Sequence, residues 1–321
     1  MRPILITKEI HTLAAKYAKN LFLARQATFI RPVVHLRNLA NTLGRRTSLT
    51  ADYKDYVLMI IALYRWINLI KPQQFQQFHD KFFDRFTVNL ERKIKIGKKT
   101  MALHKHISFA MRYDAVRDQE FLPYVRQLGI RTCVYCNANY ALSISTGTDH
   151  YGKFELDHYW PQSKFPYLCT NFYNLTPCCS NCNKYKLNKE SLFSLYEASH
   201  ANLSPFEFEL EKKSIVKYML SQDLAHLNIL FKAPLNPVHA TLFKIGPTYD
   251  VLKDVAEELV WKHKIYNQNY LDGLKKAFGH KFNTSSFHRF LLGNYDQAKD
   301  IHKRPLAKLT QDIAKQLKII K

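Results

Sequence analysis

Four of the six cysteines in this chain form two pairs, Cys133-Val-Tyr-Cys136 and Cys179-Ser-Asn-Cys182. Two intervening residues let both thiolates of a pair reach one ion from a tight turn, and two such turns complete the tetrahedral four-sulfur shell that zinc prefers. Because sulfur fills all four positions, the ion has no open position for a substrate. The spacing therefore predicts one structural Zn²⁺ bound by Cys133, Cys136, Cys179 and Cys182.

The two remaining cysteines, Cys169 and Cys178, lie in the same short stretch of the chain. This clustering favours metal binding over disulfides, and a redox role for one CxxC pair is an alternative that zinc content would exclude. We expect Cys169 to be a small buried hydrophobic residue. Cys178 allows a second register for the second pair, but only Cys179 keeps the two-residue gap to Cys182.

Between the cysteine pairs, further residues occur in a recognisable order: Phe154-Glu-Leu-Asp157-His158-Tyr-Trp-Pro161, then Asn174-Leu-Thr-Pro, then Cys182-Asn183-Lys-Tyr-Lys186. This stretch resembles the HNH endonuclease family, whose ββα-metal motif contains an Asp-His pair, a central Asn and a final His or Asn. The resemblance is confined to the region around residues 128–190. It gives no function to the sequences that flank it.

Hydrolysis of a phosphodiester requires a base that activates water and a cation that absorbs the negative charge developing on the phosphate. His158 is the candidate base, because a neutral imidazole with an ordinary pKa near 6.5 accepts a proton at cellular pH. Its side chain and that of Asp157 would point to opposite faces of an extended strand. Both can still flank one site where a strand turns into a loop.

The resemblance implies roles for three further residues. Asp157 would be a ligand of a catalytic divalent cation, and its hard carboxylate oxygen suits Mg²⁺ or Mn²⁺; alternatively, Asp157 only orients a neighbouring group. Asn183 takes the place of the final histidine and would be the second ligand. Asn174 resembles the central asparagine, which is expected to brace the loop carrying the base by hydrogen bonds.

Several charged residues surround this motif. Lys186 lies three residues after Asn183, one helical turn on, and could contact the scissile phosphate. Lys184 and Lys189 would contact flanking phosphates or only solvent. Glu155 would share a strand face with Asp157 and could support it, or it could be an exposed strand carboxylate.

The charge of the whole chain points to a polyanionic partner. Its 321 residues include 48 Lys and Arg against 26 Asp and Glu, a formal net charge of +22. A field of this size favours nucleic acid over acidic membrane surfaces or acidic proteins, and predicts steeply salt-dependent binding. We expect the nucleic acid to be DNA rather than RNA, although charge alone does not distinguish them. One basic run contains Arg92, Lys93, Lys95, Lys98 and Lys99, with His104, Lys105 and His106 following. It is either a solvated helix face or a phosphate-contacting surface.

No segment has the character of a secretory signal or a membrane span. Charges at Lys8, Glu9 and Lys16 interrupt the N-terminal sequence, so we expect a cytoplasmic protein. The most apolar run, from Tyr56 to Ile70, contains Arg65 and is shorter than the roughly 20 residues that a membrane span needs. It is more typical of a buried helix, and no membrane partner is expected.

Hydrophobic spacing predicts a mostly helical α+β protein, and the resemblance implies a central zinc-stapled ββα-metal core. Residues 1–127 are expected to form a helical region of five or six helices, the clearest of which begins near Thr50, capped by its hydroxyl, and ends before Pro72. Residues 128–190 would be the HNH core. Residues 191–321 would be mixed, mainly helical: short strands are expected at 206–210, 214–220 and 226–231, and helices at 252–266, 270–278 and 306–317.

These patterns together predict a metal-dependent HNH endonuclease that hydrolyses nucleic-acid phosphodiester bonds. The alternative is a catalytically silent, zinc-dependent nucleic-acid-binding subunit. The combination of an HNH core with a basic helical body is similar to nucleases of bacterial antiviral defence, of the Septu and retron-associated kind, which act beside a separate ATPase. A partner ATPase or another regulatory subunit that gates the enzyme is therefore expected.

Overall fold

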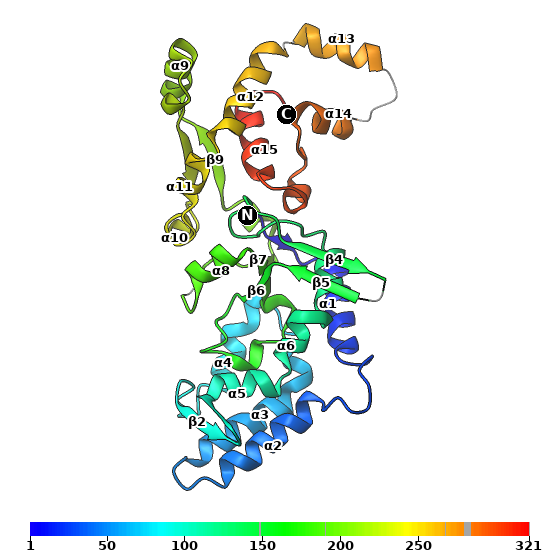
Figure 1. Cartoon of the computed structure of the whole chain (residues 1–321), viewed down its shortest axis with the longest axis vertical. Coiled ribbons are helices and arrows are strands. Elements are labelled where there is room, and N and C mark those ends of the chain that lie inside the picture. Colours follow the sequence, from blue (N-terminus) through cyan, green and yellow to red (C-terminus); the bar gives the residue numbers. More distant parts are fainter. Residues whose placement is uncertain (148, 190, 267, 279–283, 321) are drawn as a thin grey trace.

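The computed structural model describes residues 1–147, 149–189, 191–266, 268–278 and 284–320, and confirms a mostly helical α+β fold with small sheets (Figure 1). The helices are α1 (Lys8–Asn20), α2 (Pro32–Gly44), α3 (Ala51–Ile67), α4 (Phe75–Phe82), α5 (Leu103–Ala110), α6 (Tyr113–Ala115), α7 (Leu122–Gln127), α8 (Ser180–Lys186), α9 (Lys212–Ser221), α10 (Pro237–Leu242), α11 (Ile245–Asp250), α12 (Lys253–Ile265), α13 (Gln268–Phe278), α14 (Thr284–Leu292) and α15 (Ala307–Gln316). The strands are β1 (Ile4–Leu5), β2 (Lys93–Ile96), β3 (Lys99–Ala102), β4 (Leu142–Thr146), β5 (Asp149–Lys153), β6 (Glu155–His158), β7 (Leu175–Cys178), β8 (Tyr196–Glu197), β9 (Glu207–Leu210) and β10 (Ile229–Lys232).

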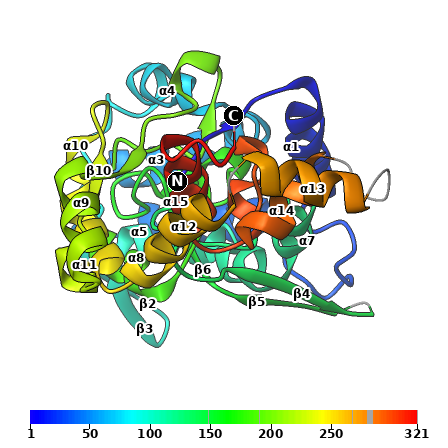
Figure 2. The ribbon, with the colours of Figure 1, turned by 90° about the horizontal axis from the view of Figure 1, so that it is seen from above.

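The molecule is elongated, with the strands β4 to β7 and helix α8 near its middle (Figure 1). Helices α2 to α5 occupy one end and helices α9 and α11 to α15 the other. Seen along the long axis, the β2–β3 and β4–β5 hairpins and α8 lie toward the same side of the molecule (Figure 2). Among the described residues, no helix is long and apolar enough to cross a membrane.

Every sheet in the described residues has two strands. The central pair is antiparallel β6–β7, in which Asp157 lies opposite Thr176 and His158 opposite Leu175. Helix α8 follows β7 directly and packs against β6. Two antiparallel strands and a helix therefore meet where the sequence places its Asp-His pair.

The N-terminal helices are built as their hydrophobic spacing predicts, with one difference at a helix start. Among the described residues, helices α2 and α3 make the most extensive helix–helix contact, and Val57 and Ile60 of α3 are fully buried. Thr50 is the N-cap residue of α3, but its hydroxyl makes no capping hydrogen bond. The expected cap bond is therefore wrong, although the expected helix is present.

Two expectations about strands and helices are corrected. Residues 214–220 are part of helix α9 and not a strand, because Ser214 and Tyr218, one helical turn apart, are the buried residues of that helix. The basic run after Arg92 is not a helix face but the β2–β3 hairpin, which turns at Gly97 with φ +58°. A positive φ is a conformation that glycine adopts without steric cost.

The C-terminal end is fastened to the middle of the chain through buried polar groups. Asn137 donates from Nδ2 to the Ile301 carbonyl (2.9 Å) and accepts at Oδ1 from the Lys308 amide (2.9 Å). His302 donates from Nε2 to the Arg2 carbonyl (2.6 Å), and its own carbonyl accepts from the Arg131 amide (2.8 Å). These bonds join segments that lie far apart in the sequence.

Burial makes His302 a source of acid sensitivity. Burial, with smaller contributions from the N-terminal ammonium and Arg2, lowers the pKa of His302 from 6.5 to about 3. Below pH 6.5 the unfolded chain therefore protonates His302, whereas the folded chain does not. The free energy of unfolding then falls as pH drops from 6.5 toward 3, by up to about 1.4 kcal/mol per pH unit. Urea unfolding at several pH values should show that the free energy of unfolding decreases less at low pH in His302→Asn than in the native chain. Equal losses would contradict this origin.

Candidate metal centre and adjoining cleft

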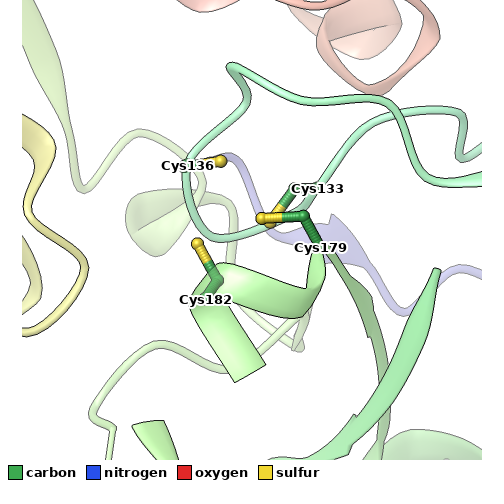
Figure 3. Close-up of side chains that lie close together, drawn as sticks. All are labelled: Cys133, Cys136, Cys179 and Cys182. Carbon is green, nitrogen blue, oxygen red and sulfur yellow. The ribbon is translucent and has the colours of Figure 1, made fainter. Parts of the chain in front are cut away.

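The two cysteine pairs converge on one point (Figure 3). The Sγ atoms of Cys133, Cys136, Cys179 and Cys182 all lie within 4.8 Å of one another, and these side chains form the one group of three or more His, Cys, Asp or Glu in the described residues that could hold a metal ion. Four converging sulfurs suit a tetrahedral ion such as Zn²⁺, which binds thiolates at about 2.3 Å. The group can therefore hold a structural metal.

Local backbone geometry brings the sulfurs together. The first pair lies in a turn closed by the Asn137 amide, which donates to the Cys133 carbonyl (2.9 Å), and Asn137 itself has φ +54°. Asparagine tolerates this left-handed conformation better than most residues. The second pair uses the start of α8, with Cys179 as its N-cap residue and Cys182 in its first turn.

Neighbouring groups favour charged sulfur at two of the four positions. The Asn139 amide donates to Sγ of Cys136 (3.8 Å) and of Cys179 (3.7 Å), one from each pair. The neighbouring Cys133 thiol is the main cause that lowers the pKa of Cys136 and Cys179, whereas burial raises the pKa of Cys133 and the neighbouring thiols raise that of Cys182. Metal ligation by cysteine requires the thiolate, so a bound cation would have to displace the protons of Cys133 and Cys182.

Cys178 and Cys169 lie outside the group, as expected from the register of the pairs. Both are fully buried, and burial raises the pKa of each thiol. They therefore contribute packing and no metal ligand.

A cleft of about 560 Å³ lies beside the metal centre, between β6 and α8. It brings together three residues of the sequence motif, Asp157, His158 and Asn183, with Glu155 at its wall. The lining residues are Tyr113, Arg117, Glu155, Leu156, Asp157, His158, Pro161, Gln162, Ser180, Asn181, Asn183, Lys184, Leu187 and Asn188. Asp157 and His158 reach one cleft although they are neighbours, because β6 ends at His158.

His158 is held in one orientation. Its Nε2 donates to the Cys169 carbonyl (3.1 Å), and its ring packs against Tyr113 at 4.7 Å between centroids. Tyr113 in turn donates from its hydroxyl to the Leu156 carbonyl (2.7 Å). Burial lowers the pKa of His158 to about 4, so the imidazole is neutral at neutral pH. With its proton on Nε2, the neutral ring carries its lone pair on Nδ1.

Asp157 is clamped from both sides of the metal centre. Tyr135, between the two cysteines of the first pair, donates from its hydroxyl to Oδ2 of Asp157 (2.5 Å). Lys186, one turn after Cys182, places its Nζ 3.0 Å from the same oxygen and 3.3 Å from Oδ1. All three side chains are buried. The carboxylate is therefore positioned by Tyr135, inside the first cysteine pair, and by Lys186, one turn after the second pair.

The expected phosphate contact of Lys186 is wrong in this geometry. Its side chain is completely buried, does not line the cleft, and donates to the His158 carbonyl (2.7 Å) in addition to pairing with Asp157. The exposed Lys184 lines the cleft instead. Lys189 is exposed and is not among the residues that line it.

Asn174 holds the loop that follows His158. Its Nδ2 donates to the carbonyls of Trp160 (3.2 Å) and Leu168 (3.1 Å), and its Oδ1 accepts from the Trp160 amide (2.7 Å). Its carbonyl accepts from the Tyr159 amide (2.9 Å). Asn174 thus connects the two ends of this loop from a fully buried position, away from the cleft.

Sequence reasoning missed the contribution of the segment before the first cysteine pair. Tyr113 and Arg117 both line the cleft. Arg117 is held by Asp114 (3.2 Å) and Asp118 (2.7 Å), so its charge is already compensated. No spacing pattern links these residues to the Asp-His pair, and only the fold brings them together.

A second cleft, of about 460 Å³, adjoins the first and shares Glu155, Ser180 and Asn181 with it. Its other lining residues include Lys153 and Tyr140, which is 57% exposed. The two clefts therefore lie on either side of Glu155 and the start of α8.

The donors of the first cleft are compatible with a hard divalent cation. Mg²⁺ commonly uses one or two protein carboxylates and completes its shell with water and substrate phosphate. Asp157 supplies one carboxylate and Asn183 an amide oxygen on the same cleft. Oδ1 of Asp157 receives only the long contact from Lys186, which leaves it the more available oxygen.

In comparisons with known proteins, no family model, no curated protein and no solved structure matches this chain.

The metal centre predicts different zinc contents for two adjacent cysteine variants. We expect Cys179→Ser to lose most of the zinc, because it removes one of four sulfurs, whereas Cys178→Ala keeps about one ion per chain. Elemental analysis of the purified proteins measures this directly. Zinc loss in Cys178→Ala with retention in Cys179→Ser would show that the second pair uses the other register.

Variants of the buried Lys186 and the exposed Lys184 test whether the ion pair with Asp157 stabilises the site. Lys186→Met leaves a buried carboxylate without its cation and should lower the free energy of unfolding by about 3 to 5 kcal/mol. Lys184→Met, at an exposed position, should change it by no more than about 0.5 kcal/mol. Urea denaturation of both variants gives the comparison. Similar stabilities of the two variants would mean that the buried ion pair does not hold the site.

Proposed function

We propose that this protein is a metal-dependent endonuclease of the HNH type that hydrolyses nucleic-acid phosphodiester bonds, with DNA as the favoured substrate. The observation that carries the proposal is the convergence of Asp157, His158 and Asn183 on one cleft. In the sequence the Asp157-His158 pair and Asn183 belong to separate parts of the motif. The four cysteines beside the cleft would hold one structural Zn²⁺.

His158 is the proposed general base. The hydrogen bond from its Nε2 to the Cys169 carbonyl fixes the tautomer, so that Nδ1 can accept a proton from water. Asn174 supports this role indirectly by holding the loop after His158. Oriented bases of this kind contribute roughly 10²- to 10⁴-fold to a hydrolysis rate.

Asp157 and Asn183 would hold the catalytic Mg²⁺ or Mn²⁺. When bound, such a cation polarises the phosphate and stabilises the charge that develops on the leaving oxygen. Tyr135 and Lys186 fix the Asp157 carboxylate in place, so little reorganisation of the protein is needed. Lys184 is the cleft cation best placed to contact the substrate backbone, since Arg117 is already paired.

A catalytically silent nucleic-acid-binding subunit is the second candidate. It is favoured by the ion pair of Asp157 with Lys186, because a buried ammonium already compensates the carboxylate without a divalent cation. In that case the zinc centre and the basic surface would serve binding alone. Cleavage assays separate the two candidates.

The proposed cellular role is that of an effector nuclease in antiviral defence, gated by a partner such as an ATPase. This role rests on the resemblance of the central motif and on the harm that an ungated nuclease would cause its host. Rapid degradation of cellular DNA by the purified chain alone would contradict the gating.

The nuclease activity is tested with supercoiled plasmid DNA, Mg²⁺ or Mn²⁺, and proteins of matched zinc content. We expect metal-dependent nicking or cutting that falls at least about 100-fold in His158→Ala, because that variant lacks the base. Cys169→Ala is the control, since it removes a buried thiol but keeps the carbonyl that orients His158. Undiminished cleavage by His158→Ala would exclude His158 as the base. DNA binding without cleavage by any of the proteins would point to an enzyme that needs its gating partner or to the binding subunit.

A further inference from the structure

The β2–β3 hairpin lies at the end of the molecule that α2 and α3 occupy (Figure 1), and together with the α2–α3 connection it carries seven Lys and Arg residues that form a basic surface. We propose that this basic surface is a second nucleic-acid-binding surface, separate from the cleft, which contacts the substrate backbone. The proposal rests on nucleic acid being the substrate. The basic surface consists of Arg45, Arg46, Arg92, Lys93, Lys95, Lys98 and Lys99.

Two segments that are distant in the sequence are fastened together to make this surface. Arg46 of the α2–α3 connection donates to the Lys95 carbonyl of β2, and Arg92 donates to the Ser48 carbonyl (3.2 Å). In the hairpin, Ile94 is buried while Lys93 and Lys95 on either side are exposed. The alternation of the strand therefore presents lysines outward from a fixed backbone.

No carboxylate pairs with the charges of the basic surface. Within the ranges that the structure describes, none of its nitrogens lies in a salt bridge, whereas the half-buried Lys253 and Lys262 have carboxylate partners. The adjacent carboxylate, Glu91, instead contacts His104 (3.4 Å). Unpaired cations held on one surface repel one another, and a polyanion would relieve that repulsion.

The position of the basic surface suits a substrate that also reaches the cleft. In both views, the β2–β3 hairpin and α8 lie toward the same side of the molecule (Figures 1 and 2). The chain between them runs through α5, which exposes Lys105, to the cleft residues Tyr113 and Arg117. A long nucleic acid can therefore contact both regions, whereas a mononucleotide cannot.

A phosphate backbone fits this surface better than base edges do. Lysines on a hairpin are flexible point charges, which neutralise phosphates without reading sequence. Each neutralised phosphate of a duplex releases counterions and adds about 0.9 to the slope of log Kobs against log salt. The basic surface would thus supply affinity and orientation, and leave any sequence preference to other parts of the chain.

Binding to short fluorescein-labelled DNA and RNA duplexes tests the proposal without cleavage if every protein carries His158→Ala. The test variant is Lys93→Gln/Lys95→Gln/Lys98→Gln. The matched control is Lys212→Gln/Lys213→Gln/Lys217→Gln on α9, where three exposed lysines at the other end of the molecule are removed. Fluorescence anisotropy over roughly 50 to 200 mM salt gives Kobs and its slope.

We expect the test variant to bind at least one duplex about tenfold more weakly, with a slope smaller by about 2 to 3, while the control changes little. Equal losses in both variants would show that only net charge matters and would overturn the proposal. Undiminished binding by the test variant would also overturn the proposal. Selective loss of binding to phosphatidylserine vesicles, with duplex binding intact, would assign the surface to membranes instead.

The same proteins without His158→Ala separate this proposal from the proposed function. A selective loss of duplex binding, with no plasmid cleavage by the native chain, would support the basic surface and count against hydrolysis by the chain without a partner. Cleavage with equal binding by both lysine variants would support hydrolysis and reject the surface.

Discussion

The buried carboxylate of Asp157 is the constraint on which the central region depends. A charge removed from water is costly unless it is paired, and Asp157 is paired with the Tyr135 hydroxyl and the Lys186 ammonium. Tyr135 stands between the cysteines of the first pair, and Lys186 follows the second pair on α8. Whatever ion joins the two pairs therefore also sets the distance between the two groups that hold Asp157. The metal centre and the cleft are in this sense one structure.

The same arrangement connects the cleft to the parts of the chain that precede and follow the motif. Tyr135 stacks on Phe243 at 4.4 Å, and its carbonyl accepts from Nε2 of His239 (2.8 Å), both near α10. On the other side, Tyr113 packs on His158 and belongs to the N-terminal helical part. The proposed active site is thus not a self-contained motif inserted between independent helical parts. Its geometry depends on side chains that both parts contribute.

The sequence predicted the cysteine group and the common site of Asp157, His158 and Asn183, because both depend on short spacings within one stretch. It predicted the helix-rich fold from hydrophobic periodicity along the chain. It did not predict that Lys186 is buried. The spacing of one turn from Asn183 shows which helix face carries Lys186, but not which residues pack against that face. It also predicted a strand at residues 214–220, and for the basic run after Arg92 it predicted either a helix face or a phosphate-contacting surface, not a hairpin. In both segments the outcome depends on tertiary contacts, namely the packing of Ser214 and Tyr218 and the fastening of Arg46 to β2. Arg117 and Tyr113 reach the cleft only through the fold.

The most direct test of the account is amide hydrogen exchange of the full chain before and after zinc withdrawal by a chelator. If the ion holds the two sides of the Asp157 clamp together, its removal should accelerate exchange in β6, β7 and α8, while α2 and α3, which pack on each other far from the centre, remain protected. Unchanged protection of β6 and α8 after complete removal of zinc would contradict the account, because the cleft would then be ordered without the metal.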